Sequence, residues 1–282
     1  MDRIWTRGGL ACRVYSVPLV TRFRGIAQRE GMVIQGPAGW GEFSPFWDYG
    51  PAESAPWLAA ALEAANHGYP PAVRGSVPVN VTVPAVGPAR AAAAVLASGG
   101  CATAKVKVAQ PGQTSAQEAD RLAAVRDALG PAGRIRIDAN GAWDVETAVE
   151  RLALLDRAAG GLEYAEQPCR DVRELAALRR RTHVPIAADE SIRLAADPLE
   201  AVRLRAADVI VMKVQPLGGV RACLALAQQI GLPIVVSSAL ETSVGLAAGQ
   251  GLRPRPPAFL HTQRRLHGPG GLATAQRSSE RA

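Results

Sequence analysis

Ionisable residues recur at regular intervals in this sequence from residue 105 onward, each at or near the end of a short run rich in β-branched residues. Parallel barrels build their active sites from such positions, because the C-terminal ends of all their strands meet on one face. A salt bridge or a helix cap would explain any one of them, but explains the whole series poorly. The members are Lys107, Asp138, Glu166, Asp189 and Lys213, followed by the polar pair Ser237 and Ser238.

Three members of this series are carboxylates, and the series contains no Cys or His. Asp138, Glu166 and Asp189 would repel one another strongly at one strand edge unless a cation neutralised them. Carboxylate oxygens alone select a hard divalent cation, so the pattern predicts a Mg²⁺ site, with Mn²⁺ as an alternative ion. The competing interpretation is that these carboxylates pair with arginines such as Arg136 and Arg193.

Lysine is rare in this chain, since all but three of its 32 Lys and Arg residues are arginine. Lys105 and Lys107 lie two positions apart on one predicted strand and therefore point to the same face, and Lys213 lies across the predicted ring. Lysine can lose its proton when it is desolvated or near another cation, so Lys105 favours a neutral Lys107 that acts as a base. An exposed edge strand is the competing explanation for the Lys-x-Lys pattern.

A divalent cation flanked by two lysines suits the removal of a proton α to a carboxylate. The cation holds the carboxylate and stabilises the enediolate, while a lysine removes the proton. The residues therefore predict an enzyme whose substrate is a small-molecule carboxylate.

The elements that must position these residues alternate between strand and helix patterns. Seven β-branched runs are separated by Ala/Leu/Arg stretches with helical spacing, which predicts βαβ units and a parallel sheet. A period of roughly 25–30 residues favours an α/β barrel over an open sheet. The predicted strands are 77–83, 104–108, 134–138, 162–166, 185–189, 208–214 and 233–237.

A different pattern precedes the barrel and predicts a small α+β unit. We expect this unit to occupy residues 1–75 and to be completed by an irregular tail at about 252–282, with the barrel domain at 76–251. The elements predicted within it are strands at 10–20, 25–35 and 40–43, a helix at about 53–67 and a Pro/Gly-rich linker at 68–75.

Composition and charge limit the classes of partner that we expect this protein to bind. The net charge of +7 comes from the chain ends, because residues 1–40 carry six arginines against two acids and residues 253–282 carry six against one. Aromatic residues make up 5% of the chain, whereas nucleic-acid surfaces interleave basic and aromatic residues, so no nucleic-acid partner is expected. Widely spaced cysteines, no signal peptide and no apolar span predict a cytoplasmic protein without a membrane partner. A monomer and a homo-oligomer both remain open.

Five motifs follow one another along the predicted strands: K-V-K at 105–107, R-I-D-A-N at 136–140, E-Q-P at 166–168, D-E-S at 189–191 and K-V-Q-P-L-G-G at 213–219. In this order they resemble the enolase superfamily, and within it the muconate-lactonising subgroup. The resemblance implies a (β/α)7β modified TIM barrel. It also implies that the N-terminal α+β unit, with G-W-G-E at 39–42, is a capping domain over the barrel mouth.

The same resemblance implies a role for each matching residue. Asp138, Glu166 and Asp189 would ligate Mg²⁺, and Lys107 and Lys213 would form the acid/base pair. The other residues are, by expected role, Lys105, Arg136, Ser237 and Ser238 for substrate binding, and Asn140 and Glu190 for orienting the metal ligands.

Arg136, the segment S-S-A-L-E-T-S at 237–243, and the segments R-F-R-G at 22–25 and R-E-G at 29–31 are similar to features of the o-succinylbenzoate synthases of actinobacterial type. That resemblance implies a carbon–oxygen lyase of menaquinone biosynthesis. Its reaction is the Mg²⁺-dependent syn dehydration of 2-succinyl-6-hydroxy-2,4-cyclohexadiene-1-carboxylate to o-succinylbenzoate.

Other activities of the subgroup use the same kind of site, namely N-succinylamino-acid racemisation, dipeptide epimerisation and muconate cycloisomerisation. Racemisation needs both lysines as bases, whereas dehydration needs only one. Two further classes are a Schiff-base aldolase on a barrel, which needs a strand-end lysine but no trio of carboxylates, and a non-catalytic binding scaffold, which needs neither.

Overall fold

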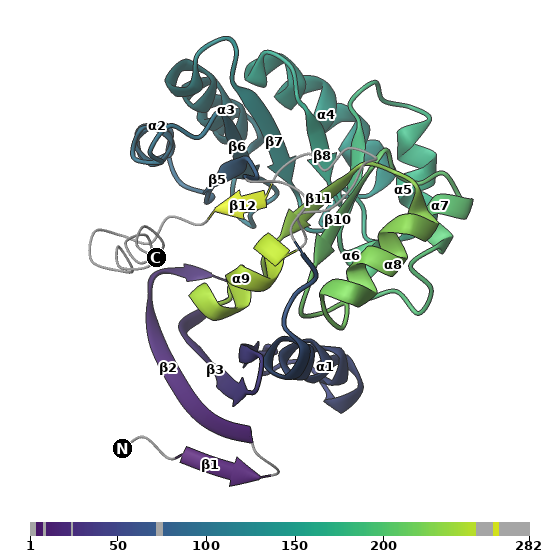
Figure 1. The fold of residues 1–282 in the computed structure, drawn as a ribbon. Coiled ribbons are helices and arrows are strands. Elements are labelled where there is room, and N and C mark those ends of the chain that lie inside the picture. Colours follow the sequence, from purple (N-terminus) through teal and green to yellow (C-terminus); the bar gives the residue numbers. More distant parts are fainter. Residues whose placement is uncertain (1–3, 8–9, 24, 72–75, 252–261, 265–282) are drawn as a thin grey trace.

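The computed structural model describes residues 4–7, 10–23, 25–71, 76–251 and 262–264, and these contain two sheets (Figure 1). The first sheet has the order β1-β2-β3-β4 and is antiparallel throughout. The second has the order β11-β10-β9-β8-β7-β6-β5-β12 and is parallel. Among the described helices, none is long and apolar enough to cross a lipid bilayer.

The strands are β1 (Ile4–Arg7), β2 (Leu10–Phe23), β3 (Ile26–Gly36), β4 (Gly39–Phe43), β5 (Val79–Val83), β6 (Thr103–Lys107), β7 (Arg134–Asp138), β8 (Tyr164–Glu166), β9 (Ile186–Ala188), β10 (Val209–Lys213), β11 (Ile234–Ser237) and β12 (Thr262–Arg264). The helices are α1 (Pro51–His67), α2 (Pro88–Leu96), α3 (Ser115–Leu129), α4 (Val145–Ala159), α5 (Val172–Arg179), α6 (Glu190–Arg193), α7 (Glu200–Arg203), α8 (Val220–Ile230) and α9 (Ser243–Gly251).

The parallel sheet curls into a barrel: β11 and β12, the strands at its two ends, contact each other. Helices that follow the strands cover its outer face (Figure 1). Seven strands with following helices and a closing eighth strand are the (β/α)7β arrangement, and the antiparallel sheet with α1 forms the additional α+β unit. The predicted fold class is confirmed.

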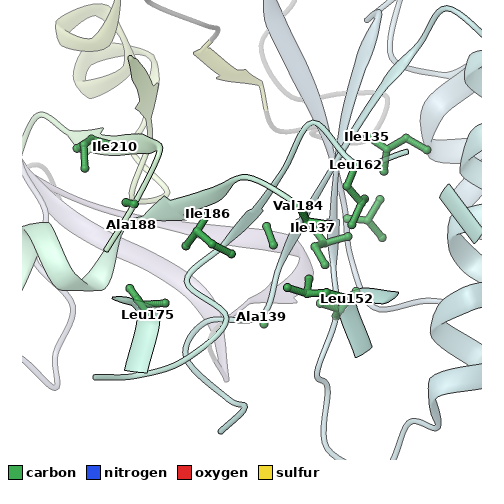
Figure 2. Packing of buried hydrophobic residues seen from close by; sticks show 14 of the residues in the cluster. Ile135, Ile137, Ala139, Leu152, Leu162, Leu175, Val184, Ile186, Ala188 and Ile210 are labelled. Atoms are coloured by element: carbon green, nitrogen blue, oxygen red, sulfur yellow. The ribbon is translucent and has the colours of Figure 1, made fainter. Parts of the chain in front are cut away.

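Strand β7 shows how the sequence assigns side chains to the two faces of the barrel wall. Successive residues of a strand point to opposite faces. Ile135 and Ile137 join the buried cluster between sheet and helices, together with residues such as Leu152 and Ile186 (Figure 2). Each large aliphatic side chain buried in this way contributes about 1.5–3 kcal/mol. The alternate residues therefore face the barrel interior, and Asp138 ends the strand on that face.

Polar side chains cap helices α3 and α4, which follow strands β6 and β7. The Thr114 side chain accepts a hydrogen bond from the Gln117 backbone N–H at the start of α3, and Asp144 does the same for Thr147 at the start of α4. Such caps are worth about 1 kcal/mol each. They fix the loops between each strand end and its helix, which are the loops that surround the barrel mouth.

In the N-terminal unit, helix α1 packs directly on strands β3 and β4. A Cβ atom on Gly41 would lie 1.9 Å from the backbone oxygen of Ala61, and one on Gly36 would lie 2.5 Å from that of Ala65. Both positions therefore require glycine for the close approach of sheet and helix.

Two short strands differ from the sequence-based expectations. Strand β1 was not predicted, and β12 lies in the tail at 252–282 that was expected to be irregular and to complete the cap. Strand β12 pairs with β5, so this segment belongs to the barrel sheet instead. The edge of β5 needs a hydrogen-bonding partner, while the Pro/Arg/Gly-rich surroundings of β12 give no strand pattern. The rest of the tail lies outside the described residues, and the other domain boundaries stay predictions.

Candidate active site

A cavity of about 670 Å³ lies at the C-terminal ends of the barrel strands. Barrel strands contribute charged and hydroxyl side chains to its wall, and the N-terminal unit contributes aromatic ones. Three of the predicted residues, Arg136, Glu166 and Asp189, do not line the cavity, but Glu166 and Asp189 contact lysines that do. The predicted residues that line it are Lys105, Lys107, Asp138, Asn140, Glu190, Lys213, Ser237 and Ser238.

The three predicted metal ligands are buried carboxylates on neighbouring strands. Asp138 at the end of β7 pairs in register with Glu166 at the end of β8, and Asp189 directly follows β9. Their side chains are 1%, 0% and 1% exposed. Carboxylates removed from water in this way need cations beside them, because an unpaired buried charge is very costly.

Lysine ammonium groups supply those cations in this structure. Lys105 Nζ lies 2.8 Å from Asp138 Oδ2 and 2.5 Å from Glu166 Oε1, so it bridges the two carboxylates. Lys107 Nζ lies 2.6 Å from the same Asp138 oxygen. On strand β10, the Lys213 ammonium donates a hydrogen bond to Asp189 Oδ2.

These contacts move the pKa values of neighbouring groups in different directions. Burial lowers the pKa of the Lys107 ammonium; Asp138 opposes this shift and the charge of Lys105 adds to it. Burial would also lower the pKa of Lys105, but Asp138 and Glu166 together outweigh it and raise that pKa. Burial and the charge of Asp138 raise the pKa of the Glu166 carboxyl to about 7. Of the two lysines on β6, Lys107 therefore loses its proton more readily.

The three carboxylates do not converge on one point. Within the described part of the chain, no group of three His, Cys, Asp or Glu side chains is placed as a metal centre requires. Lys105 and Lys213 instead each form an ion pair with one of these carboxylates, Glu166 and Asp189 respectively.

The donor set nevertheless fits a hard divalent cation. All three groups present oxygen atoms, and the buried Oε2 atom of Glu166 has no hydrogen-bond partner among the described residues. Burial and the charges of Asp138 and Asp189 disfavour a negative charge on Glu166, and a cation at its unpartnered oxygen would offset that cost.

Asn140 and Glu190 connect the acid/base residues to the loops around the mouth. The Asn140 side-chain oxygen accepts a hydrogen bond from Lys107 Nζ at 2.6 Å, and the Asn140 backbone N–H donates to Asp138 Oδ1 at 3.0 Å. The Asn140 amide donates to Glu190 Oε1 at 3.4 Å, and Arg193 donates to the same oxygen at 2.7 Å. This chain of contacts orients Lys107 and Asp138 relative to each other.

Ser237 and Ser238 present unused hydroxyl groups to the cavity. Both are buried at the end of β11, and neither side-chain oxygen has a hydrogen-bond partner among the described residues. A buried hydroxyl left unpaired costs about 1–3 kcal/mol. Both groups are therefore placed to bind a polar group of a ligand in the cavity.

The two arginines considered in the sequence, Arg193 and Arg136, lie in different places relative to the cavity. Arg193 Nε lies 3.1 Å from Asp189 Oδ1, which is the pairing expected by the interpretation without a metal. Arg136 instead donates to Glu163 Oε2 at 2.6 Å and to Asn80 Oδ1 at 3.0 Å, and it does not line the cavity. The structure thus does not place Arg136 in the cavity wall, and its substrate contact stays a prediction. Arg136 shares the interior face of β7 with the strand-end carboxylate but lies two residues, about 6.6 Å, deeper in the barrel.

Comparisons with known proteins agree with this geometry. The family model of the enolase C-terminal domain-like fold matches residues 88–266, and that of the enolase N-terminal domain-like fold matches residues 14–65. An o-succinylbenzoate synthase of Thermobifida fusca is 62% identical over 90% of this chain and 81% of its own length. This chain belongs to the o-succinylbenzoate synthase family of the enolase superfamily. The corresponding protein of Mycolicibacterium smegmatis is 56% identical over 84% of this chain and 72% of its own length.

Solved structures of other enolase-superfamily enzymes share the fold of this synthase-family chain. The L-Ala-D/L-Glu epimerase of Bacillus subtilis has a TM-score of 0.76 at 24% identity and covers 90% of this chain and 88% of its own. A dipeptide epimerase of Enterococcus faecalis, complexed with Mg and a dipeptide, has a TM-score of 0.75 at 22% identity and covers 93% and 90%. At this level of identity the likeness concerns the fold.

Sequence reasoning missed the aromatic wall that the N-terminal unit adds to this synthase-family site. Phe46, Tyr49 and Trp57 line the cavity and stack edge-to-face on one another, with ring centroids 5.8–6.0 Å apart. Arg193 donates a hydrogen bond to the Tyr49 hydroxyl at 2.7 Å, which joins this wall to the barrel. A usable signal was present, because the scarce aromatic residues of the chain cluster within 40–57.

Proposed function

We propose that this protein is an o-succinylbenzoate synthase that dehydrates 2-succinyl-6-hydroxy-2,4-cyclohexadiene-1-carboxylate to o-succinylbenzoate in menaquinone biosynthesis. The observation that carries the proposal is 62% identity to a synthase over 90% of this chain, together with the three cavity-lining lysines Lys105, Lys107 and Lys213. The cytoplasmic location expected from the sequence stays a prediction.

Lys107 is the proposed base. It reaches the cavity and its pKa is lowered by burial and by Lys105, so a neutral amine is accessible to it. It takes the proton α to the ring carboxylate, and the electron pair of that C–H bond forms the new ring double bond. The C–O bond then breaks, and Lys107 returns the proton to the departing hydroxyl, which leaves as water from the same face.

Lys213 has a different part in this proposal. It approaches the cavity from β10, four strands away from β6, and Asp189 accepts its hydrogen bond. There it stays an ammonium group and stabilises the negative charge that develops as the proton is removed. Lys105 provides a second fixed positive charge beside the substrate carboxylate.

Asp138, Glu166 and Asp189 are the proposed ligands of a divalent cation, with Mg²⁺ expected and Mn²⁺ as an alternative. When bound, the cation supplies positive charge to the substrate carboxylate. Asn140 and Glu190 keep the surrounding side chains oriented through their contacts with Lys107, Asp138 and Arg193. Ser237 and Ser238 bind polar groups of the substrate.

The test is an ultraviolet assay for the aromatic product, with purified full-length protein and the cyclohexadiene substrate, in the presence and absence of Mg²⁺. Product formation that depends on Mg²⁺ is expected. An enzyme that forms no o-succinylbenzoate with any divalent cation would overturn the proposed function.

The second candidate activity is N-succinylamino-acid racemisation, or a related epimerisation, and the placement of Lys107 and Lys213 on strands four apart in one cavity favours it. A racemase would use both lysines as bases. Incubation of N-succinylamino acids in D₂O distinguishes the two activities. Deuterium incorporation at the α-carbon with racemisation, faster than dehydration, would identify the racemase.

A further inference from the structure

Two charged residues of the N-terminal unit, Arg29 on β3 and Glu42 on β4, are buried against the segment that follows barrel strand β11. They belong to the sequences R-E-G and G-W-G-E, and the segment belongs to S-S-A-L-E-T-S at 237–243. The proposed reaction assigns no task to either residue. The fold nevertheless brings these three motifs into one contact.

Glu42 binds the start of helix α9. Its two carboxylate oxygens each lie 3.1 Å from the backbone N–H nitrogen of Thr242, Oε2 accepts the N–H of Gly245 at 2.9 Å, and the Thr242 hydroxyl also donates to Oε2. From its own unit, Tyr15 and Ser44 donate to Oε1 at 2.7 and 2.9 Å. A carboxylate at a helix N-terminus is stabilised by the helix dipole. Glu42 therefore joins the two domains through fixed, neutral donors.

Arg29 binds the residues just before that helix. Its Nε donates to the Leu240 carbonyl at 3.0 Å and its Nη2 to the Ala239 carbonyl at 3.4 Å, while Nη2 also donates to the Ser44 carbonyl. Leu240 has a φ of 70°, a left-handed conformation that is unfavourable for a residue other than glycine. The contact with Arg29 helps to hold the chain in this turn.

The residues held in this way are continuous with the wall of the active-site cavity. Ser237, Ser238 and Ala239 line the cavity, and Ala239 packs in one buried cluster with Phe46 and Trp57. Figure 1 shows α9 between the N-terminal strands and the barrel, and α9 contacts β4. The aromatic wall and the serine hydroxyls thus meet at the segment that Arg29 and Glu42 bind.

We propose that Arg29 and Glu42 are positioning residues, which fix residues 239–245 and thereby set Ser237 and Ser238 relative to the aromatic wall. Neither residue lines the cavity, so they act through the segment they bind. The part of this inference that concerns activity rests on the proposed function. We expect loss of the contact to weaken substrate binding, because the lysines on β6 and β10 do not take part in it.

Glu42→Gln tests this inference, since it keeps the size of the side chain but places an amide NH₂ where Glu42 accepts hydrogen bonds, and the backbone N–H groups of Thr242 and Gly245 cannot accept one in return. We expect KM to rise by roughly tenfold or more, with a smaller change in kcat. In hydrogen-exchange measurements, the amides of Thr242 and Gly245 should exchange roughly tenfold faster, while those of β6 and β7 should not change.

Asp208→Asn is the matched control. Asp208 is also a carboxylate that joins two elements, since it accepts the Ile186 N–H at 3.0 Å and a hydrogen bond from Arg179 Nε at 2.9 Å, but it lies at the N-terminal strand ends, away from the cavity. This variant should lower the melting temperature and leave KM unchanged. A rise in KM in both variants would show that Glu42 acts only through general stability and would overturn the inference.

A double variant tests whether Glu42 acts through Thr242. Thr242→Val keeps the backbone N–H and the shape of the side chain but removes its hydroxyl. Because the hydroxyl works through Glu42, the double variant should raise KM no further than Glu42→Gln alone. Additive effects, or faster exchange of residues 239–245 with an unchanged KM, would contradict the positioning role. If the wild type forms no product, the proposed function fails, and the exchange rates alone then decide whether Glu42 fixes this segment.

Discussion

Two buried glutamates, Glu166 at the barrel mouth and Glu42 in the cap, are stabilised by different kinds of hydrogen-bond donor. Glu42 accepts hydrogen bonds from backbone N–H and hydroxyl groups on both of its oxygens. Glu166 accepts one from the ammonium group of Lys105, while its other oxygen is buried without a partner among the described residues. Both side chains are nearly inaccessible, at 3% and 0% exposed.

The difference separates a carboxylate that joins the two domains from one that we propose as a metal ligand. Neutral donors satisfy both oxygens of Glu42, so we expect no cation to bind there. Glu166 has one lysine partner and one oxygen without a partner among the described residues, and burial with the charge of Asp138 raises the pKa of its carboxyl to about 7. Burial alone therefore does not identify a functional carboxylate, whereas its hydrogen-bond partners do.

The largest expected effect is the loss of turnover when a mouth lysine is removed. Lys107→Ala should lower kcat by about 10²–10⁴-fold, because general acid–base catalysis contributes rate factors of that size. Lys213→Ala should lower it by about 10²–10³-fold, because it removes the ammonium group that stabilises the developing negative charge. Circular dichroism should show an intact fold in both variants. Since only Lys107 moves a proton in the proposed reaction, near-normal product formation by Lys107→Ala would refute its assignment as the base.

A smaller effect is expected from a substitution of Arg136, which lies deeper in the barrel. Like Glu42 in the cap, Arg136 has hydrogen-bond partners from other segments of the chain. Arg136→Met should lower the free energy of unfolding by about 1–3 kcal/mol, since it removes the guanidinium group that donates to Glu163 Oε2 and Asn80 Oδ1. Urea denaturation measures this change. Unaltered stability combined with weaker substrate binding would instead favour the substrate contact expected from the sequence.

The smallest effect is expected for the half-exposed pair of Arg179 and Asp208. The hydrogen bonds from Arg179 and Ile186 outweigh burial and hold the pKa of Asp208 below its ordinary value of 3.8. Its stabilising contribution is therefore complete above pH 3.8 and is lost as the pH falls toward the folded-state pKa.

Urea denaturation of the wild type and Asp208→Asn at several pH values measures this contribution. The difference in unfolding free energy should stay below about 1 kcal/mol and shrink at acid pH. A difference that grows on acidification would show that folding raises the pKa of Asp208 instead of lowering it.

The positions of the mouth residues could be predicted from the sequence because a barrel repeats one rule. From β6 to β10, each strand ends at or beside one ionisable residue, and strand alternation decides its face, so Lys107, Asp138 and Lys213 all line one cavity. Alternation gives the face of a side chain but not its partners, so it did not show that Arg136 binds other barrel side chains. Those partners are Glu163 and Asn80, which come from two other segments of the chain.

Contacts between the two domains could not be predicted in the same way. Glu42 and Thr242 are 200 residues apart, and no local periodicity relates them. Strand β12 has only three residues and is stabilised by its pairing with β5 rather than by its own sequence pattern. Features of this kind depend on tertiary contacts, which a reading of local patterns does not contain.

Calorimetric titration of the purified protein with Mg²⁺ tests most directly whether the mouth carboxylates, and not the buried carboxylate of the cap, await a cation. One site is expected in the wild type, with an affinity that falls more than about tenfold in Glu166→Gln and stays within about twofold of the wild type in Glu42→Gln. Equal Mg²⁺ affinity in all three proteins, or no binding to the wild type, would contradict the account.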